Sequence, residues 1–94
     1  MQPSLKNIPV PNAEFRLEEF DGELLLYHPG LTQTVYLNPT ASLVWQLCDG
    51  KRSAGEIMDL LRESFPDDGG SIEKDVTTTL EMFDQYGAVR LRAS

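Results

Sequence analysis

The chain has 94 residues, of which 40% are hydrophobic and 24% are charged. A second domain would fall below the roughly 50 residues that a chain needs to bury a core, so this length predicts a single domain. Eight basic residues against fifteen acidic ones give a net charge of −7. This charge disfavours phosphate backbones and anionic lipid surfaces, so it argues against nucleic-acid and membrane partners.

The single cysteine, Cys48, excludes an internal disulfide and is compatible with a reducing compartment. No run approaches the ~18 consecutive apolar residues of a membrane span. The N-terminus also lacks the apolar core of a secretion signal. We therefore expect a soluble, cytoplasmic protein.

Residues 1–12 contain three of the six prolines, Pro3, Pro9 and Pro11, and show no apolar periodicity. Prolines without a periodic apolar pattern are typical of an extended or mobile arm. The folded domain is therefore expected to begin near Ala13 and to span residues 13–94.

Two strands are predicted directly after the arm. Phe15 and Leu17 alternate with charged residues, which is the period of a strand with one solvent-exposed face. Asp21-Gly22 is a strong hairpin turn signal. The returning run, residues 23–28, is apolar on both faces, as expected of a middle strand.

A third strand is predicted over residues 34–37. Pro29-Gly30 favours a type II turn before it, because proline fixes one φ angle and glycine adopts the positive φ that follows. The simplest arrangement of the three strands is an antiparallel meander.

Two helices are predicted next. Asn38 is a preferred N-cap and Pro39 suits the first helical position, so a helix should run to about Cys48. A capping box over residues 53–56 opens another helix, and Pro66 ends it.

A loop over residues 67–70 should lead to a third helix, from about Ser71 to Tyr86, which Gly87 ends. Its inward stripe is predicted to be Ile72, Val76, Leu80 and Phe83. The order of elements predicts an α+β fold, a three-stranded antiparallel meander followed by three helices, similar to a winged helix-turn-helix.

The residues provide little for catalysis or DNA reading. His28 and Cys48 are the only residues of their kinds, so neither a zinc site nor a Cys/His catalytic pair with supporting residues can be assembled from them. The third helix carries one lysine against four acidic residues and no arginine, which disfavours entry into a DNA groove. We expect no cofactor and no enzymatic activity.

The outer strands of a meander expose unpaired backbone groups, which proteins normally guard with charge or proline. Charged side chains guard the first strand, whereas residues 31–38 contain neither a charged residue nor a proline. A bare edge of this kind is where a peptide can add as another strand. Cover by the N-terminal arm, by a helix or by a second copy of the chain is the alternative.

Several short motifs carry a resemblance to a known family. They are Leu24-Leu25-Leu26-Tyr27, Leu37-Asn38-Pro39-Thr40-Ala41, Leu47-Cys48-Asp49-Gly50-Lys51-Arg52 and Glu56-Ile57, followed by the acidic third helix. In this pattern the chain, over roughly residues 15–89, resembles the PqqD family. Members of this family are peptide chaperones of coenzyme PQQ biosynthesis and of related peptide-modifying systems, and share the recognition element for ribosomally made, modified peptides.

The resemblance implies a winged-helix-like domain that is not an enzyme. It implies binding of the leader part of a precursor peptide against the third strand and third helix, and presentation of that peptide to a partner, often a radical SAM enzyme. Carried over to this sequence, the peptide-binding residues are Thr34, Val35, Tyr36 and Leu37 on the strand, and Asp75, Val76, Thr79, Met82, Phe83 and Tyr86 on the helix.

The bare edge and the resemblance meet on the same strand, so our first hypothesis is a peptide-binding chaperone or adaptor. An alternative is a structural or regulatory module that forms a homodimer by pairing the third strand with a second copy. A DNA-binding protein is a third hypothesis, which the charge disfavours.

Overall fold

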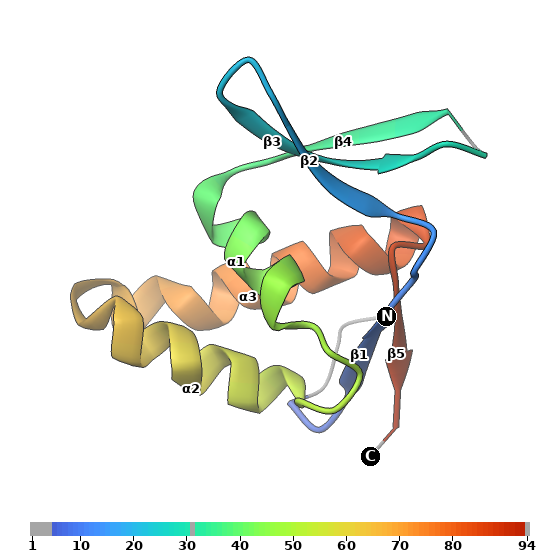
Figure 1. The fold of residues 1–94 in the computed structure, drawn as a ribbon. Coiled ribbons are helices and arrows are strands. Elements are labelled where there is room, and N and C mark those ends of the chain that lie inside the picture. The colour runs from blue at the N-terminus through green and yellow to red at the C-terminus, as the bar shows by residue number, and fades with distance from the viewer. Residues whose placement is uncertain (1–4, 31, 94) are drawn as a thin grey trace.

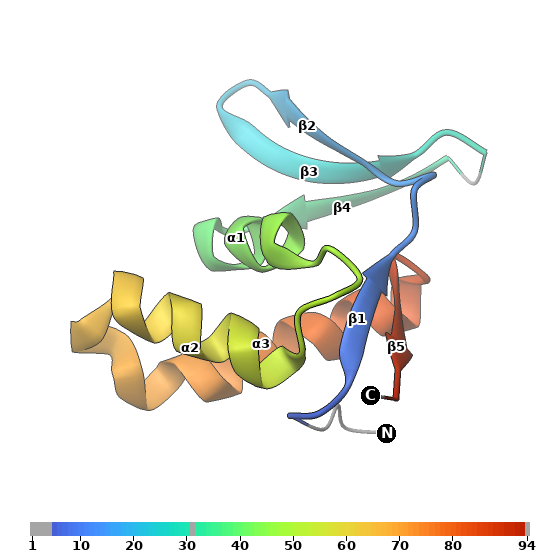
Figure 2. The same ribbon diagram turned by 60° about the horizontal axis from the view of Figure 1, so that its bottom comes forward.

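The protein is described by a computed structural model that covers residues 5–30 and 32–93, without the side chains of residues 68 and 69. A three-stranded sheet forms one layer, and three helices lie on one side of it (Figure 1). A second, two-stranded sheet lies apart from the first (Figure 2). This arrangement confirms the predicted α+β fold of a meander followed by three helices.

The three-stranded sheet is the predicted antiparallel meander. Its strands are β2 (Arg16–Phe20), β3 (Glu23–His28) and β4 (Gln33–Leu37), with β3 in the middle. Asp21 and Gly22 join β2 to β3 with φ angles of 54° and 81°. Two positive φ angles in a two-residue connection are the signature of the hairpin turn that matches the twist of its strands.

The three helices are α1 (Pro39–Leu47), α2 (Ala54–Ser64) and α3 (Gly69–Tyr86). The first N-cap is confirmed, because Asn38 Oδ1 accepts a hydrogen bond from the Ala41 N–H at 2.7 Å. The predicted capping box is also present, with Ser53 and Glu56 exchanging hydrogen bonds of 3.0 and 3.2 Å. Each cap satisfies backbone N–H groups that a helix start leaves without a partner.

The start of the third helix differs from the prediction of a loop over residues 67–70. Pro66–Asp68 form a 3₁₀ turn, and α3 begins directly after it at Gly69. Glycine is a poor helix former, and for this reason the pattern suggested a loop. The turn instead leads straight into the helix, so α3 starts two residues before the predicted Ser71.

The N-terminal segment is part of the fold, so the predicted domain start near Ala13 is wrong. Residues 8–11 form β1 (Ile8–Pro11), which pairs antiparallel with β5 (Val89–Arg92), and Pro9 is fully buried. Pro9 and Pro11 are two residues apart, so their missing N–H groups fall on one edge, as a two-stranded ribbon tolerates. Residues 1–4 of the predicted arm lie outside the described residues.

The core lies between the inner face of the meander and the helices, with α3 at its centre. The predicted inward stripe of α3 is confirmed, because its four side chains are at most 3% exposed. They are Ile72, Val76, Leu80 and Phe83. The Phe83 ring also meets the Trp45 ring of α1 edge to face, with centroids 5.7 Å apart. This packing fixes α3 relative to α1, the helix that follows β4.

Candidate functional site

Strand β4 separates the four predicted strand residues into two faces. Val35 and Leu37 are 6% and 8% exposed and belong to the core. Thr34 and Tyr36 are exposed, and the Tyr36 side chain is 63% exposed. Successive side chains of a strand point to opposite faces, so this split follows from the register. Of these four residues, only Thr34 and Tyr36 present their side chains to solvent.

The main chain of β4 follows the same alternation. The pair that flanks the two-residue turn at Asp21-Gly22 is hydrogen-bonded, and such pairs then alternate along the ladder. The register between β3 and β4 therefore directs the N–H groups of Val35 and Leu37 toward β3. The N–H and C=O groups of Thr34 and Tyr36 face the other edge, where no strand pairs among the residues that the structure describes. Within the described part of the chain, the bare edge predicted from the sequence thus has no paired strand.

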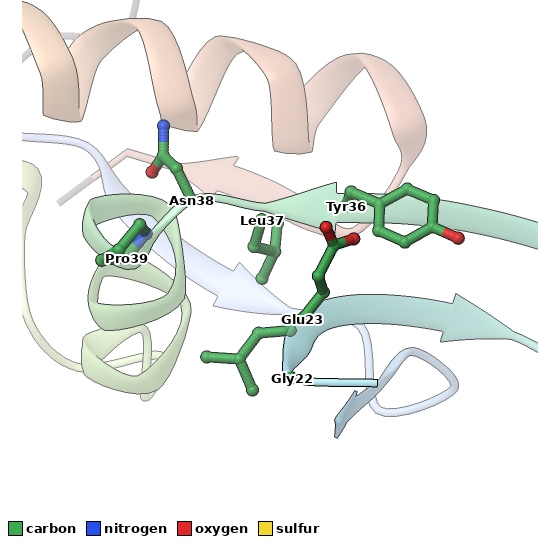
Figure 3. Close-up of a pocket in the computed structure, with 7 residues that line it drawn as sticks. Gly22, Glu23, Tyr36, Leu37, Asn38 and Pro39 are labelled. Atoms are coloured by element: carbon green, nitrogen blue, oxygen red, sulfur yellow. The ribbon is translucent and has the colours of Figure 1, made fainter. Parts of the chain in front are cut away.

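One depression of about 410 Å³ lies where β4 ends and α1 begins. Figure 3 shows the Glu23 carboxylate and the Tyr36 ring beside it, with Pro39 at the start of the helix. Its lining residues are Gly22, Glu23, Leu24, Tyr36, Leu37, Asn38 and Pro39. An extended chain along β4 would therefore reach a concave surface with aromatic, acidic and apolar groups.

A second depression, of about 280 Å³, brings α3 to the same end of β4. Asn38 and Thr40 line it from the start of α1, and the other lining residues come from α3: Lys74, Asp75, Thr78 and Thr79. In Figure 3 the Asn38 side chain points toward α3. The structure thus brings the predicted Asp75 and Thr79 beside the end of β4. The spacing of residues 74, 75, 78 and 79 predicts that they share one face of a helix. No sequence pattern predicts that Asn38 and Thr40 lie beside this face, because they meet it only in the folded structure.

The other predicted helix residues have different surroundings. Val76 and Phe83 have no exposed surface and belong to the core. Met82 is half-buried and packs against the core, whereas Tyr86 is 42% exposed. Neither Met82 nor Tyr86 lines the two depressions at the end of β4. Val76 and Phe83 therefore position α3 and do not present a side chain to a ligand.

Two titratable groups at the C-terminal end of α1 have shifted pKa values. Burial, and secondarily the nearby Asp49 carboxylate, raise the pKa of the Cys48 thiol to about 12. Cys48 is therefore a neutral thiol at physiological pH. Backbone N–H groups of Arg52 and Lys51 donate hydrogen bonds to Asp49 and hold the pKa of that carboxyl below its usual value.

Within residues 5–30 and 32–93, no three His, Cys, Asp or Glu side chains gather in a way that could hold a metal ion. No helix in the described part of the chain is both long and apolar enough to cross a membrane.

An α+β domain with an open strand edge next to a helix has the arrangement of domains that take up an extended peptide as an added strand. The family model described as Coenzyme PQQ synthesis protein D (PqqD) matches residues 23–89. The chain belongs to the PqqD family.

Similar proteins agree with this membership. A protein of Pseudomonas paraeruginosa (strain DSM 24068 / PA7) called PqqA binding protein is 39% identical over 83 residues, which cover 85% of this chain and 86% of that protein. A protein of the same name from Pseudomonas aeruginosa (strain UCBPP-PA14) is 36% identical over the same shares. A solved structure titled TbiB1 in Complex with the TbiA(beta) Leader Peptide shares the fold. It has a TM-score of 0.71 and 19% identity, and the match covers 90% of this chain and 99% of that one.

Proposed function

We propose that the protein is a peptide chaperone or adaptor without catalytic activity of its own. It binds the leader segment of a ribosomally made precursor peptide as an added strand on β4 and presents it to a peptide-modifying enzyme. A radical SAM enzyme is the partner that the family resemblance implies, and the cytoplasm is the expected location. The observation that carries the proposal is the open edge of β4, where the main-chain groups of Thr34 and Tyr36 face outward.

The chemistry of the edge fits a peptide backbone. Each outward residue offers one donor and one acceptor, so a paired peptide gains main-chain hydrogen bonds that do not depend on its sequence. Specificity then comes from alternate peptide side chains that enter the depressions formed with Glu23 and with Asp75 and Thr79. The buried Val35 and Leu37 hold the strand in place from below.

The similar proteins give the first choice of peptide. Two relatives are named for binding PqqA, and the TbiB1 structure is described as a complex with a leader peptide. A PqqA-type precursor is therefore the first candidate ligand, and coenzyme PQQ biosynthesis is the first candidate pathway.

Titration of the ¹⁵N-labelled protein with a PqqA-type peptide, and with other candidate precursors of the same genome, tests the proposal. Amide shifts should concentrate in residues 32–38, and backbone amides of α3 near Asp75 and Thr79 should also shift. A scrambled peptide of equal composition is the matched control. Shifts confined to β2, with its charged residues, would contradict the proposal.

The same open edge supports the alternative hypothesis of self-pairing, in which β4 of two copies would form a continuous sheet. Molar mass measured by light scattering across a concentration series separates the two functions. A mass that doubles with concentration, without a response to any precursor peptide, would favour the dimerisation module. A constant monomer mass with peptide-dependent shifts supports the adaptor.

A further inference from the structure

A separate concave surface lies between α1 and α2, whose positions Figure 2 shows. This α1–α2 groove has a volume of about 380 Å³ and is lined by the apolar residues Leu43, Leu47, Leu60, Leu61 and Phe65, together with polar residues at its rim. Leu60 and Phe65 are 36% and 39% exposed. Exposed apolar side chains gathered around a concavity are typical of a surface that contacts another protein.

The polar residues of the groove differ in whether their side chains have hydrogen-bond partners within the protein. The Ser64 hydroxyl donates to the Leu60 carbonyl at 3.2 Å, and the Gln46 amide donates to Ser42 Oγ at 3.1 Å. The Glu63 carboxylate is exposed and has no ion pair or hydrogen bond among the described residues. Glu63 is therefore the charged group of the groove that is left for a partner.

The neighbouring arginine does not neutralise Glu63. Arg62 forms ion pairs with Asp59 at 3.2 Å and with Glu73 of α3 at 3.4 Å. No basic residue lines the groove. The whole chain carries a net charge of −7, so the field around the groove also favours a cationic partner.

We propose that the α1–α2 groove docks a partner protein through a short, basic amphipathic helix. The apolar face of that helix covers Leu60 and Phe65, and a lysine or arginine at its border pairs with Glu63. A helix fits better than a strand, because α1 and α2 offer no unpaired strand edge while their apolar side chains suit anchors at helical spacing. The groove shares no lining residue with the two depressions at the end of β4. Docking here therefore does not depend on the proposed peptide site and leaves it accessible.

The probe is a synthetic amphipathic peptide of leucine and lysine, about 14 residues or four helical turns long. A leucine and glutamate peptide with the same apolar face is its counterpart. Addition of the lysine peptide to the ¹⁵N-labelled protein should shift amides of α1 and α2 around Leu43 and Leu60. The glutamate peptide should bind at least about tenfold more weakly, because its charges meet Glu63 and the acidic surface.

Three variants make the test specific to the groove. Glu63→Lys reverses the charge of the free carboxylate and should weaken the lysine peptide about fivefold or more. Leu60→Ala removes an exposed apolar side chain and should weaken it by about the same factor without unfolding the domain. Glu18→Lys makes the same charge change on the exposed β2 strand, so it should leave the affinity within about twofold.

The proposal is overturned if the shifts fall outside α1 and α2, if Glu18→Lys weakens binding as much as Glu63→Lys, or if Leu60→Ala binds as tightly as the unchanged protein. Titration of the Glu63→Lys variant with the PqqA-type peptide keeps the two sites apart. Normal shifts in residues 32–38 with a weakened lysine peptide support two separate surfaces. If this variant loses both the shifts with the PqqA-type peptide and the binding of the lysine peptide, the lysine peptide binds at the β4 site and not in the groove.

Discussion

Proline substitutions at two adjacent residues of β4 give the sharpest test of strand addition. Tyr36 directs its N–H to the open edge, and its side chain is 63% exposed. Tyr36→Pro should therefore keep the domain folded but remove one donor to the peptide. A main-chain hydrogen bond contributes about 0.5–1.5 kcal/mol net, which is an affinity loss of about 2- to 13-fold. Tyr36→Ala keeps the N–H and removes the ring, so the difference between the two variants isolates the hydrogen bond.

Val35 is expected to respond in the opposite way. Its N–H points toward Leu26 of β3, and Leu26 has no exposed surface. Val35→Pro leaves the Leu26 carbonyl without a hydrogen-bond donor in the core and also removes core packing. Together these losses should lower the free energy of unfolding by about 3 kcal/mol or more. For a domain of this size, that loss lowers the Tm by roughly 10 °C or more. Val35→Ala, which retains the N–H, should cost only about 1.5–2 kcal/mol.

Urea unfolding followed by far-UV circular dichroism gives the stability of all four variants, and calorimetric titration with the PqqA-type peptide gives their affinities. Equal affinities of Tyr36→Pro and Tyr36→Ala would show that the peptide does not pair with the β4 backbone. Equal stabilities of Val35→Pro and Val35→Ala would show that the deduced direction of the N–H groups is wrong.

Three further outcomes follow from the structure. Ser53→Ala removes one half of the capping box and should lower the free energy of unfolding by about 0.5–2 kcal/mol in a urea titration, with unchanged peptide affinity because the box is remote from β4. Met82→Ala should lower the free energy of unfolding by about 2 kcal/mol and Tyr86→Ala by less than about 1 kcal/mol, since Met82 packs on the core and Tyr86 is 42% exposed. A loss of peptide affinity in either folded variant would extend the peptide site along α3. The Cys48 thiol should resist a thiol reagent at pH 8 until the chain unfolds, and stability should fall as the pH rises from 9 toward 12, because the thiol ionises first in the unfolded chain.

Most of the elements that the sequence predicts correctly have local signals, although Gly30 does not adopt the positive φ predicted for it, which occurs at Thr32 instead, at 51°. Asp21-Gly22 sets the hairpin, Asn38 caps α1 and Ser53 opens α2, and each of these acts within a few residues of the chain. The β1–β5 pair has no such signal, because Ile8 pairs with Arg92 across almost the whole chain. The prolines of β1, which locally indicate an arm, are compatible with a ribbon only once a partner strand is known.

In the candidate site, too, local patterns predict some features and the tertiary structure alone provides others. Alternation along β4 separates exposed Tyr36 from buried Val35 once the inner face of the sheet is known. Helical periodicity places Val76 and Phe83 on the inward stripe of α3, and the structure shows that neither has an exposed surface to offer a ligand, although both belong to the set carried over from the family. The meeting of Asn38 with Asp75 depends on how α1 packs on α3, which only the tertiary structure provides.

The ribbon of β1 and β5 has a consequence for how this domain can be joined to other proteins. Asn12 donates its N–H to the Ala88 carbonyl at 2.7 Å and its side-chain amide to the Gly87 carbonyl at 3.2 Å, which closes the inner end of the ribbon, and the pairing of β1 with β5 joins the two terminal segments. Both ends leave from this ribbon, apart from the open strand (Figures 1 and 2). A tag, a linker or a whole enzyme attached at either end would therefore tether the domain while β4 stays unobstructed. The architecture suits genetic fusion in both orders.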